Sequence, residues 1–191
     1  QDLLTHIRSF GKLGIESFYI AFYNCTGLIS VPKYCPESIS NMSYMFRGCS
    51  GAAFNPDVSN WDVSNVTDMQ VMFSRCSGAA FNPDVSAWDV SNVNNMYSTF
   101  YLCSGDAFNP DVSAWNVSNV TSMQSIFHDC SGNAFRGGRG TTGTGIANWT
   151  PDSLTNAAYF MLSSKKQEVG FLDSILTAWA DIIDDIDHPL P

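Results

Sequence analysis

The sequence predicts one repeat solenoid, built from short strands and turns and closed by a C-terminal helix. Residues 54–134 consist of three copies of a 27-residue unit, and self-similarity at such a period is the signature of stacked repeats. In each copy apolar residues keep their register, and small polar residues lie between them. After Ser164 the apolar spacing becomes helical. These three features together predict the fold class.

The regular copies repeat almost letter for letter. They are FNPDVSNWDVSNVTDMQVMFSRCSGAA (54–80), FNPDVSAWDVSNVNNMYSTFYLCSGDA (81–107) and FNPDVSAWNVSNVTSMQSIFHDCSGNA (108–134). One copy cannot bury its Trp, Met and two Phe by itself, so stacking must line them up as core ladders. The ladders expected are Trp61, Trp88, Trp115 and Trp149; Met42, Met69, Met96 and Met123; and Cys49, Cys76, Cys103 and Cys130.

We expect a single domain, 1–191, of about six coils. Residues 1–49 form two degenerate coils, in which Phe10 and Tyr34 take the Trp place. The regular repeats occupy 50–134, and a last coil with a glycine-rich insertion occupies 135–164. Residues 165–191 are expected to form a helical cap, whose polar face is acidic, and a tail.

The insertion FRGGRGTTGTGIAN (135–148) contains a literal G-x-G-x-x-G at Gly138, Gly140 and Gly143. A dinucleotide site needs a strand before this motif and a helix after it, whereas here the motif interrupts a repeat. We therefore expect a surface loop rather than a phosphate site. Arg136 and Arg139 make this loop the one basic spot expected on an acidic chain, and hence a candidate contact loop.

Composition restricts the partners. The net charge is −9 and the chain has only nine Lys and Arg, so nucleic acid and anionic membranes are poor partners. No apolar run is long enough to span a membrane. The chain begins at Gln1 without a secretory leader, so we expect that a signal peptide has been removed and that the protein is secreted or at the cell surface.

Sequons of the N-x-[S/T] type support an extracellular setting. In a eukaryotic secretory host some would carry glycan, whereas in a bacterial source they would mean little. The candidate acceptors are Asn24, Asn41, Asn65, Asn116, Asn119 and Asn148.

The cysteines leave two alternatives open. A stacked cysteine column brings neighbouring Cα atoms to about 4.8 Å, which suits either buried thiols or disulfides. Cys25 and Cys35 lie off the regular ladder and are a candidate disulfide, unless Cys25 extends the column. No C-x-x-C pair or histidine partner points to zinc.

Other repeated columns favour structure over chemistry. Asp57, Asp84 and Asp111 follow N-P and fit turns in which Asp accepts backbone N–H bonds, with calcium bridging as the alternative. The Met column fits core packing better than a soft-metal site. No cofactor is expected. The histidines His6, His128 and His188 lie outside any catalytic motif, so we expect no enzyme.

One family resemblance covers nearly the whole chain. The motif W-D-V-S-N-V-T-D-M-x-x-M-F-x-x-C at 61–76, repeated every 27 residues, resembles the BspA-type surface proteins, a leucine-rich-repeat-like family. The segments AFYNCTGLISVP (21–32) and SLTNAAYFML…FLDSILTAWA (153–180) are similar to other parts of such arrays. The resemblance implies a right-handed, leucine-rich-repeat-like solenoid, export to the cell surface, and adhesion or binding rather than catalysis.

Two functions follow as hypotheses. In the first, the chain is a structural subunit that associates with copies of itself into an extracellular coat or filament, because open heterologous contacts generate filaments. In the second, it is a cell-surface adhesin that recognises a glycan or a matrix protein.

Overall fold

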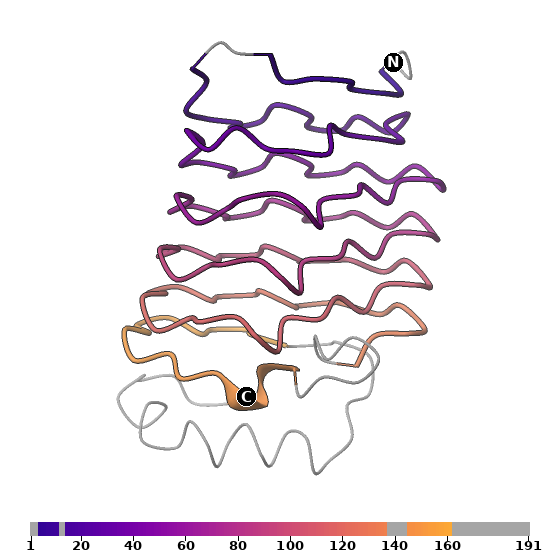
Figure 1. The fold of residues 1–191 in the computed structure, drawn as a ribbon. Helices are drawn as coiled ribbons and strands as arrows, with labels where there is room; N and C mark the ends of the chain where they lie inside the picture. Colours follow the sequence, from indigo (N-terminus) through magenta and orange to yellow (C-terminus); the bar gives the residue numbers. More distant parts are fainter. Residues whose placement is uncertain (1–3, 12–13, 137–144, 162–191) are drawn as a thin grey trace.

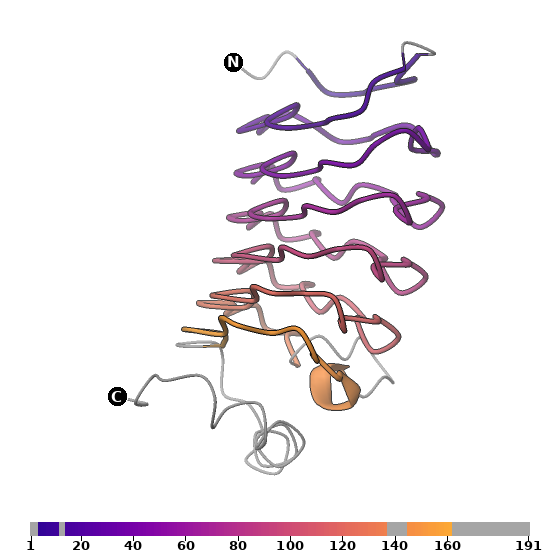
Figure 2. The ribbon, with the colours of Figure 1, turned by 90° about the vertical axis from the view of Figure 1, so that its left-hand side faces the viewer.

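The computed structural model describes residues 4–11, 14–136 and 145–161. Within them the chain winds into a stack of coils, with each coil lying on the preceding one along a single axis (Figures 1 and 2). Isolated parallel bridges join equivalent residues of successive coils, from Ser17 through Asn41, Asp68, Asn95 and Ser122 to Asn156. The stack therefore follows the repeat, with one coil for each copy.

One side of the stack, the turn face, comprises residues 17–25, 41–49, 68–76, 95–103, 122–130 and 156–161. Here alternate backbone N–H groups of one coil donate to carbonyls of the next. Val71 N–H donates to Tyr97 O at 2.8 Å, and Phe73 N–H donates to Thr99 O at 2.9 Å. These regular bonds hold the coils in register on this side.

Each coil crosses the turn face in successive tight turns. Cys76 N–H donates to Phe73 O at 3.1 Å, and the third residue of that turn, Arg75, has a φ of 62°. Val71 holds the same left-handed conformation, which is uncommon for a β-branched residue. The positive-φ residues of the turn face other than glycine are Ile20, Asn24, Tyr44, Val71, Arg75, Ser98, Leu102, Ser125, Asp129 and Tyr159.

The fold class expected from the sequence, a right-handed, leucine-rich-repeat-like solenoid with short parallel strands and a capping helix, is wrong. In the part of the chain that the structure describes there is no strand and no sheet, only isolated bridges. The one helix there is a 3-10 helix, η1, Gly145–Asn148. On the turn face, left-handed residues bend the backbone every few residues, which prevents an extended segment there. The cap expected over 165–191 lies outside the described residues.

The interior consists of aromatic side chains packed on their own copies. The rings of Trp88, Trp115 and Trp149 stack nearly parallel, with centroids 6.5 and 6.1 Å apart. A second column stacks Phe73 on Phe100 at 5.6 Å. The four Trp side chains are 2–4% exposed, and the four Met side chains of the predicted ladder are fully buried.

Each indole also makes a hydrogen bond to the coil before it. Trp88 Nε1–H donates to Val58 O, and Trp115 Nε1–H donates to Val85 O, both at 3.0 Å. Trp149 makes the same bond to Val112 O at 2.9 Å, although the insertion separates it further in sequence. The column therefore leaves no indole N–H unsatisfied in the core.

The cysteine column is a ladder of buried thiols. Cys76 and Cys103 donate their S–H groups to Phe46 O and Phe73 O, at 3.2 and 3.1 Å. Burial raises the pKa of the Cys49 thiol to about 12. All six cysteines are free, so the disulfide suggested for Cys25 and Cys35 is not formed in this structure.

Tyr34 does not take the Trp place that the sequence suggested. Its side chain is 65% exposed, and the ring of Phe10 instead packs edge-on against Trp61, at 5.8 Å between centroids. The second coil is shorter than the others. Trp61 Nε1–H donates to Pro32 O, and in the regular coils the equivalent acceptor lies three residues before the Trp place, so that place falls at the buried Cys35.

Candidate functional site: a tyrosine-lined groove on the turn face

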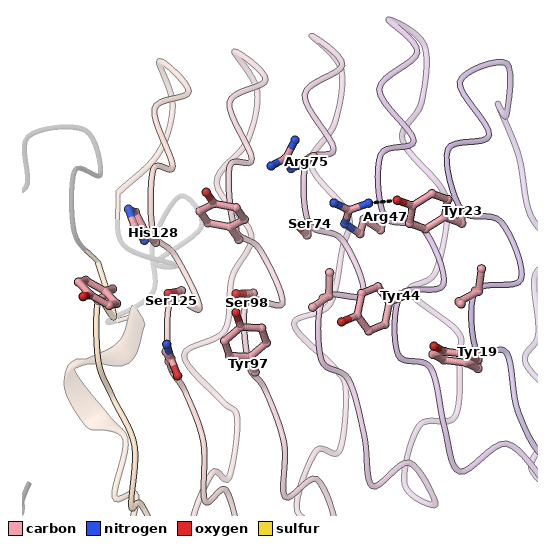
Figure 3. A pocket seen from close by; sticks show the side chains of 15 residues that line it. Tyr19, Tyr23, Tyr44, Arg47, Ser74, Arg75, Tyr97, Ser98, Ser125 and His128 are labelled. Atoms are coloured by element: carbon pink, nitrogen blue, oxygen red, sulfur yellow. Dashed lines mark hydrogen bonds between the residues drawn. The ribbon is translucent and has the colours of Figure 1, made fainter.

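A groove of about 800 Å³ runs along the turn face, across successive coils (Figure 3). Six of the seven tyrosines of the chain line it, and the seventh is Tyr34. The six are Tyr19, Tyr23, Tyr44, Tyr97, Tyr101 and Tyr159. Such a concentration makes this surface the strongest candidate for a binding site.

The turns of each coil direct the lining residues outward. In the third copy, Met123 and Phe127 are fully buried, and Gln124, Ser125 and His128 around them line the groove. The buried pair anchors the coil, Gln124 and His128 beside it are partly exposed, and Ser125 and Ile126 between them are buried. Each coil from 17–25 to 156–161 thus contributes side chains to the groove (Figure 3).

These lining positions are also where the copies differ most. Aligning the three regular copies gives 27 columns of equivalent residues. Of the six columns that begin at residues 70–75, five contain different residues, whereas only five of the other 21 columns do. Only the buried Phe73 column is unchanged within that segment. The repeat has therefore changed the four columns of this segment that supply groove residues, and it has also changed one buried column, Met72, Thr99 and Ile126.

Many of the tyrosine rings are open to solvent. Tyr19 and Tyr159 are 56% and 51% exposed, and Tyr23 and Tyr97 are 38% and 37% exposed. Tyr19 meets Tyr44 edge-on, with centroids 5.9 Å apart. Exposed aromatic side chains gathered on one surface are typical of interaction sites.

Two arginines supply positive charge to the groove. The Arg47 guanidinium lies 4.9 Å from the ring centroid of Tyr23 and donates a hydrogen bond to the Tyr23 hydroxyl. The Arg75 guanidinium lies 6.0 Å from the ring centroid of Tyr101. Neither arginine has a carboxylate partner among the described residues. Cation–π contacts therefore hold both guanidinium groups beside tyrosine rings.

A histidine closes the row near the last described coil. The His128 ring meets Tyr101 edge-on at 5.3 Å and stacks on Tyr159 at 5.9 Å. Its Nε2 lies 3.4 Å from Asp129 Oδ2. Aromatic contacts thus run from coil to coil along this part of the wall.

The comparisons with known proteins give one match. A family model described as a Mycoplasma protein of unknown function, DUF285, matches residues 16–137, more than half of the chain. The chain belongs to this DUF285 family. The comparisons with curated proteins and with solved structures found no match.

In this DUF285 chain the repeated aspartates form turns. Asp57 Oδ1 accepts a hydrogen bond from Ser59 Oγ at 2.7 Å, and Asp84 Oδ1 accepts one from Ser86 Oγ at 2.7 Å. Asp111 Oδ1 accepts from Ser113 N–H at 3.0 Å. Among the described residues, no group of three or more His, Cys, Asp or Glu is arranged to hold a metal ion.

The predicted glycan acceptors have different surroundings. Asn65 Nδ2 donates to Glu37 O at 3.0 Å, and Asn119 Nδ2 donates to Ser91 O at 2.7 Å, so both amides bridge to the preceding coil. Asn24 and Asn116 are exposed, and Asn41 is half-buried. The side chain of Asn148 is outside the described part of the structure.

The loop suggested as a contact site is described only in part. Arg136 is exposed, and its Nη1 donates to Asn133 O and Phe135 O at 3.1 and 2.8 Å. Arg139 and the three glycines of the motif lie outside the described residues. In the ranges that the structure describes, no helix has the length and apolarity of a membrane span.

The groove itself was not anticipated from the sequence, although a signal for it exists. A column-by-column comparison of the three copies marks 70–75 as the segment of greatest change. A further pattern missed was an asparagine ladder, in which Asn55 Oδ1 accepts from Asn82 N–H at 2.9 Å and Asn82 Oδ1 accepts from Asn109 N–H at 2.8 Å.

Proposed function

We propose that this chain is a non-catalytic, extracellular recognition module that binds its ligand in the turn-face groove. The observation that carries the proposal is a difference between columns: the Trp and Phe columns that pack on their own copies are kept, whereas the columns that begin at 70, 71, 74 and 75 and supply groove residues all differ. Packing alone does not require such changes, whereas a binding surface for one particular ligand does.

The chemistry of the groove agrees with this role. Tyrosine offers a large, rigid contact area with a polar tip, and serine offers adaptable hydrogen bonds. Arginine and tyrosine are enriched where binding energy is concentrated. The groove contains all three residue types, including Ser74, Ser98 and Ser125. These serines are at most 7% exposed and form the floor of the groove.

The resemblance to BspA-type surface proteins supports an extracellular place for such a module. Within this proposal the chain is an adhesin-like member of the family, displayed at or released from a cell surface. Its proposed activity is ligand binding in the groove, without catalysis.

The test is a binding screen against arrayed glycans and extracellular matrix proteins, with matched tyrosine variants. We expect at least one ligand to bind the unmodified protein, and Tyr97→Ser to abolish that binding. Tyr34→Ser is the control, because Tyr34 is exposed but lies outside the groove. A protein that binds nothing, or that loses binding with Tyr34→Ser and keeps it with Tyr97→Ser, contradicts the proposal.

Self-association into a coat or filament, the other function expected from the sequence, stays a prediction. Light scattering at high protein concentration addresses it, because a strict monomer would exclude a filament subunit.

A further inference from the structure

We propose that the ligand of the turn-face groove is a glycan that bears carboxylate groups. This inference rests on the proposed recognition function and narrows it to one ligand class. Three features of the groove lead to it: the sign of its charge, the arrangement of its aromatic rings, and the bonding of its main chain.

The charge of the groove is opposite to that of the protein. The chain has a net charge of −9, yet Arg47 and Arg75 line the groove; no Asp or Glu of the described residues lines it, and Asp129 lies beside its end, 3.4 Å from His128 Nε2. Arg75 is exposed, and its guanidinium has no carboxylate partner within the described ranges. A guanidinium presents a planar fork that matches a carboxylate with two hydrogen bonds. The groove is thus prepared for an anion from outside the chain.

The rings of the groove form a series of platforms. Successive coils are separated by about 4.8 Å, close to the length of one sugar ring in a chain. Tyr97 and Tyr101 lie on one coil, His128 lies on the next, and Tyr159 lies beyond it. An aromatic face suits the apolar face of a pyranose, while tyrosine and serine hydroxyls suit its hydroxyl groups. A chain of sugars running along the groove would meet an aromatic ring or a guanidinium group at each coil that lines it.

An acidic peptide fits the same charge less well. An extended peptide gains affinity by adding main-chain hydrogen bonds to a free edge. Here the backbone N–H groups beneath the groove are already bonded to the next coil, as with Val71 N–H to Tyr97 O at 2.8 Å and Ser98 N–H to Gln124 O at 2.9 Å. The groove therefore offers side chains only, which favours a ligand recognised by its faces and substituents.

Calorimetry with four probes tests the inference. The carboxylated probes are a hyaluronan octasaccharide and a polysialic acid octamer. The neutral probe is carboxyl-reduced hyaluronan of the same length, and the peptide probe is an octamer of glutamate. We expect at least one carboxylated glycan to bind, its binding to weaken as salt is added, and the neutral and peptide probes to bind about tenfold or more weakly.

Two charge-matched variants locate the contact. Arg75→Gln should weaken carboxylated-glycan binding about tenfold or more, because one charge-assisted pair is lost. Arg136→Gln, which removes the same charge outside the groove, should leave binding unchanged. Circular dichroism establishes that both variants remain folded.

Several outcomes overturn the inference. Equal binding of the carboxyl-reduced form would identify a neutral glycan, and tighter binding of the glutamate octamer would identify an acidic peptide. Loss of binding in Arg136→Gln alone would place the contact in the 135–148 loop. If none of the probes binds while the wider screen finds another ligand that depends on Tyr97, the recognition function stands and the carboxylated-glycan assignment falls.

Discussion

The interior of each coil and its turn face come from the same repeat, yet they respond to repetition in opposite ways. In the interior, Phe73 and Trp88 meet copies of themselves or of each other, so every copy carries the same residue. On the turn face, Ser74, Tyr101 and His128 occupy one column with three different residues. Contact between equivalent positions fixes these aromatic columns, whereas the residues that line the groove differ from copy to copy.

The comparison assigns stability to one side of the coil and recognition to the other. A substitution in an invariant column should damage two neighbouring contacts at once, because each side chain packs between the coils before and after it. A substitution in a changed column that lines the groove should cost little stability and act on binding. The following variants test that division, in order of expected effect.

Trp88→Ala should have the largest effect. The indole is 4% exposed, stacks on Trp115 and donates a hydrogen bond to Val58 O. We expect the free energy of unfolding, measured by urea denaturation, to fall by about 3–5 kcal/mol. The matched variant Tyr34→Ser should change it by less than about 1 kcal/mol. Equal losses in the two variants would remove the distinction between interior and surface.

Gly105→Ala should come next. A Cβ at this position would collide with the carbonyl oxygen of Gly78 in the preceding coil. Because that neighbour is backbone, the coils must move apart, and we expect a loss of about 1–3 kcal/mol in unfolding free energy. Ser104→Ala, at the exposed neighbouring residue, serves as the control. An unchanged denaturation midpoint for Gly105→Ala would mean that the coils are not in close contact there.

Arg75→Gly should separate stability from recognition. Arg75 has a φ of 62°, a conformation that glycine adopts without strain. We expect thermal unfolding to show a gain of about 1 kcal/mol, together with loss of ligand binding. Arg136→Gly lacks this conformational benefit, because Arg136 has no positive φ. A destabilised Arg75→Gly would show that the arginine side chain supports the fold.

The smallest expected effect is a decrease in the free energy of unfolding at acid pH. Hydrogen bonds from Ser64 hold the pKa of Asp62 below its ordinary value, and those from Ser91 do the same for Asp89. Since the folded pKa is the lower one, these carboxylates add stability above their unfolded pKa and lose it as pH falls through the folded pKa. Both are exposed, so we expect only a few tenths of a kcal/mol each.

The third copy supplies the matched control for this pH effect. Asn116 replaces the aspartate, and its Oδ1 accepts the same bonds from Ser118, at 3.2 and 2.8 Å. The double variant Asp62→Asn and Asp89→Asn should therefore keep the turns and lose part of the acid sensitivity in urea denaturation. The same pH profile in both proteins would contradict this assignment.

Some of this architecture is readable from the sequence because repetition exposes it. The period and the placement of Trp, Met and Cys follow from letters that recur every 27 residues. The absence of strands does not follow, because Val71, Arg75 and Leu102 adopt left-handed φ values that no sequence pattern of these residue types indicates. Tyr34 was misplaced because the second coil is shortened, which puts Cys35 at the Trp place and leaves Tyr34 exposed.

The groove was missed for a related reason. A search for repeated chemistry gives weight to what the copies share, and the groove consists of what they do not share. Tyr19, Tyr44 and Tyr97 are not related by the 27-residue period, so they come together only once the coils are stacked.

The most direct test of the division between interior and groove is to replace 70–75 of the first regular copy by 124–129 of the third. The change introduces Val71→Ser, Ser74→His and Arg75→Asp at groove positions and the conservative Met72→Ile in the interior, within an otherwise unchanged stack. We predict a thermal midpoint within a few degrees of the unmodified protein, with binding to the groove ligand abolished. A protein that unfolds, or one that folds and still binds as before, would contradict the account.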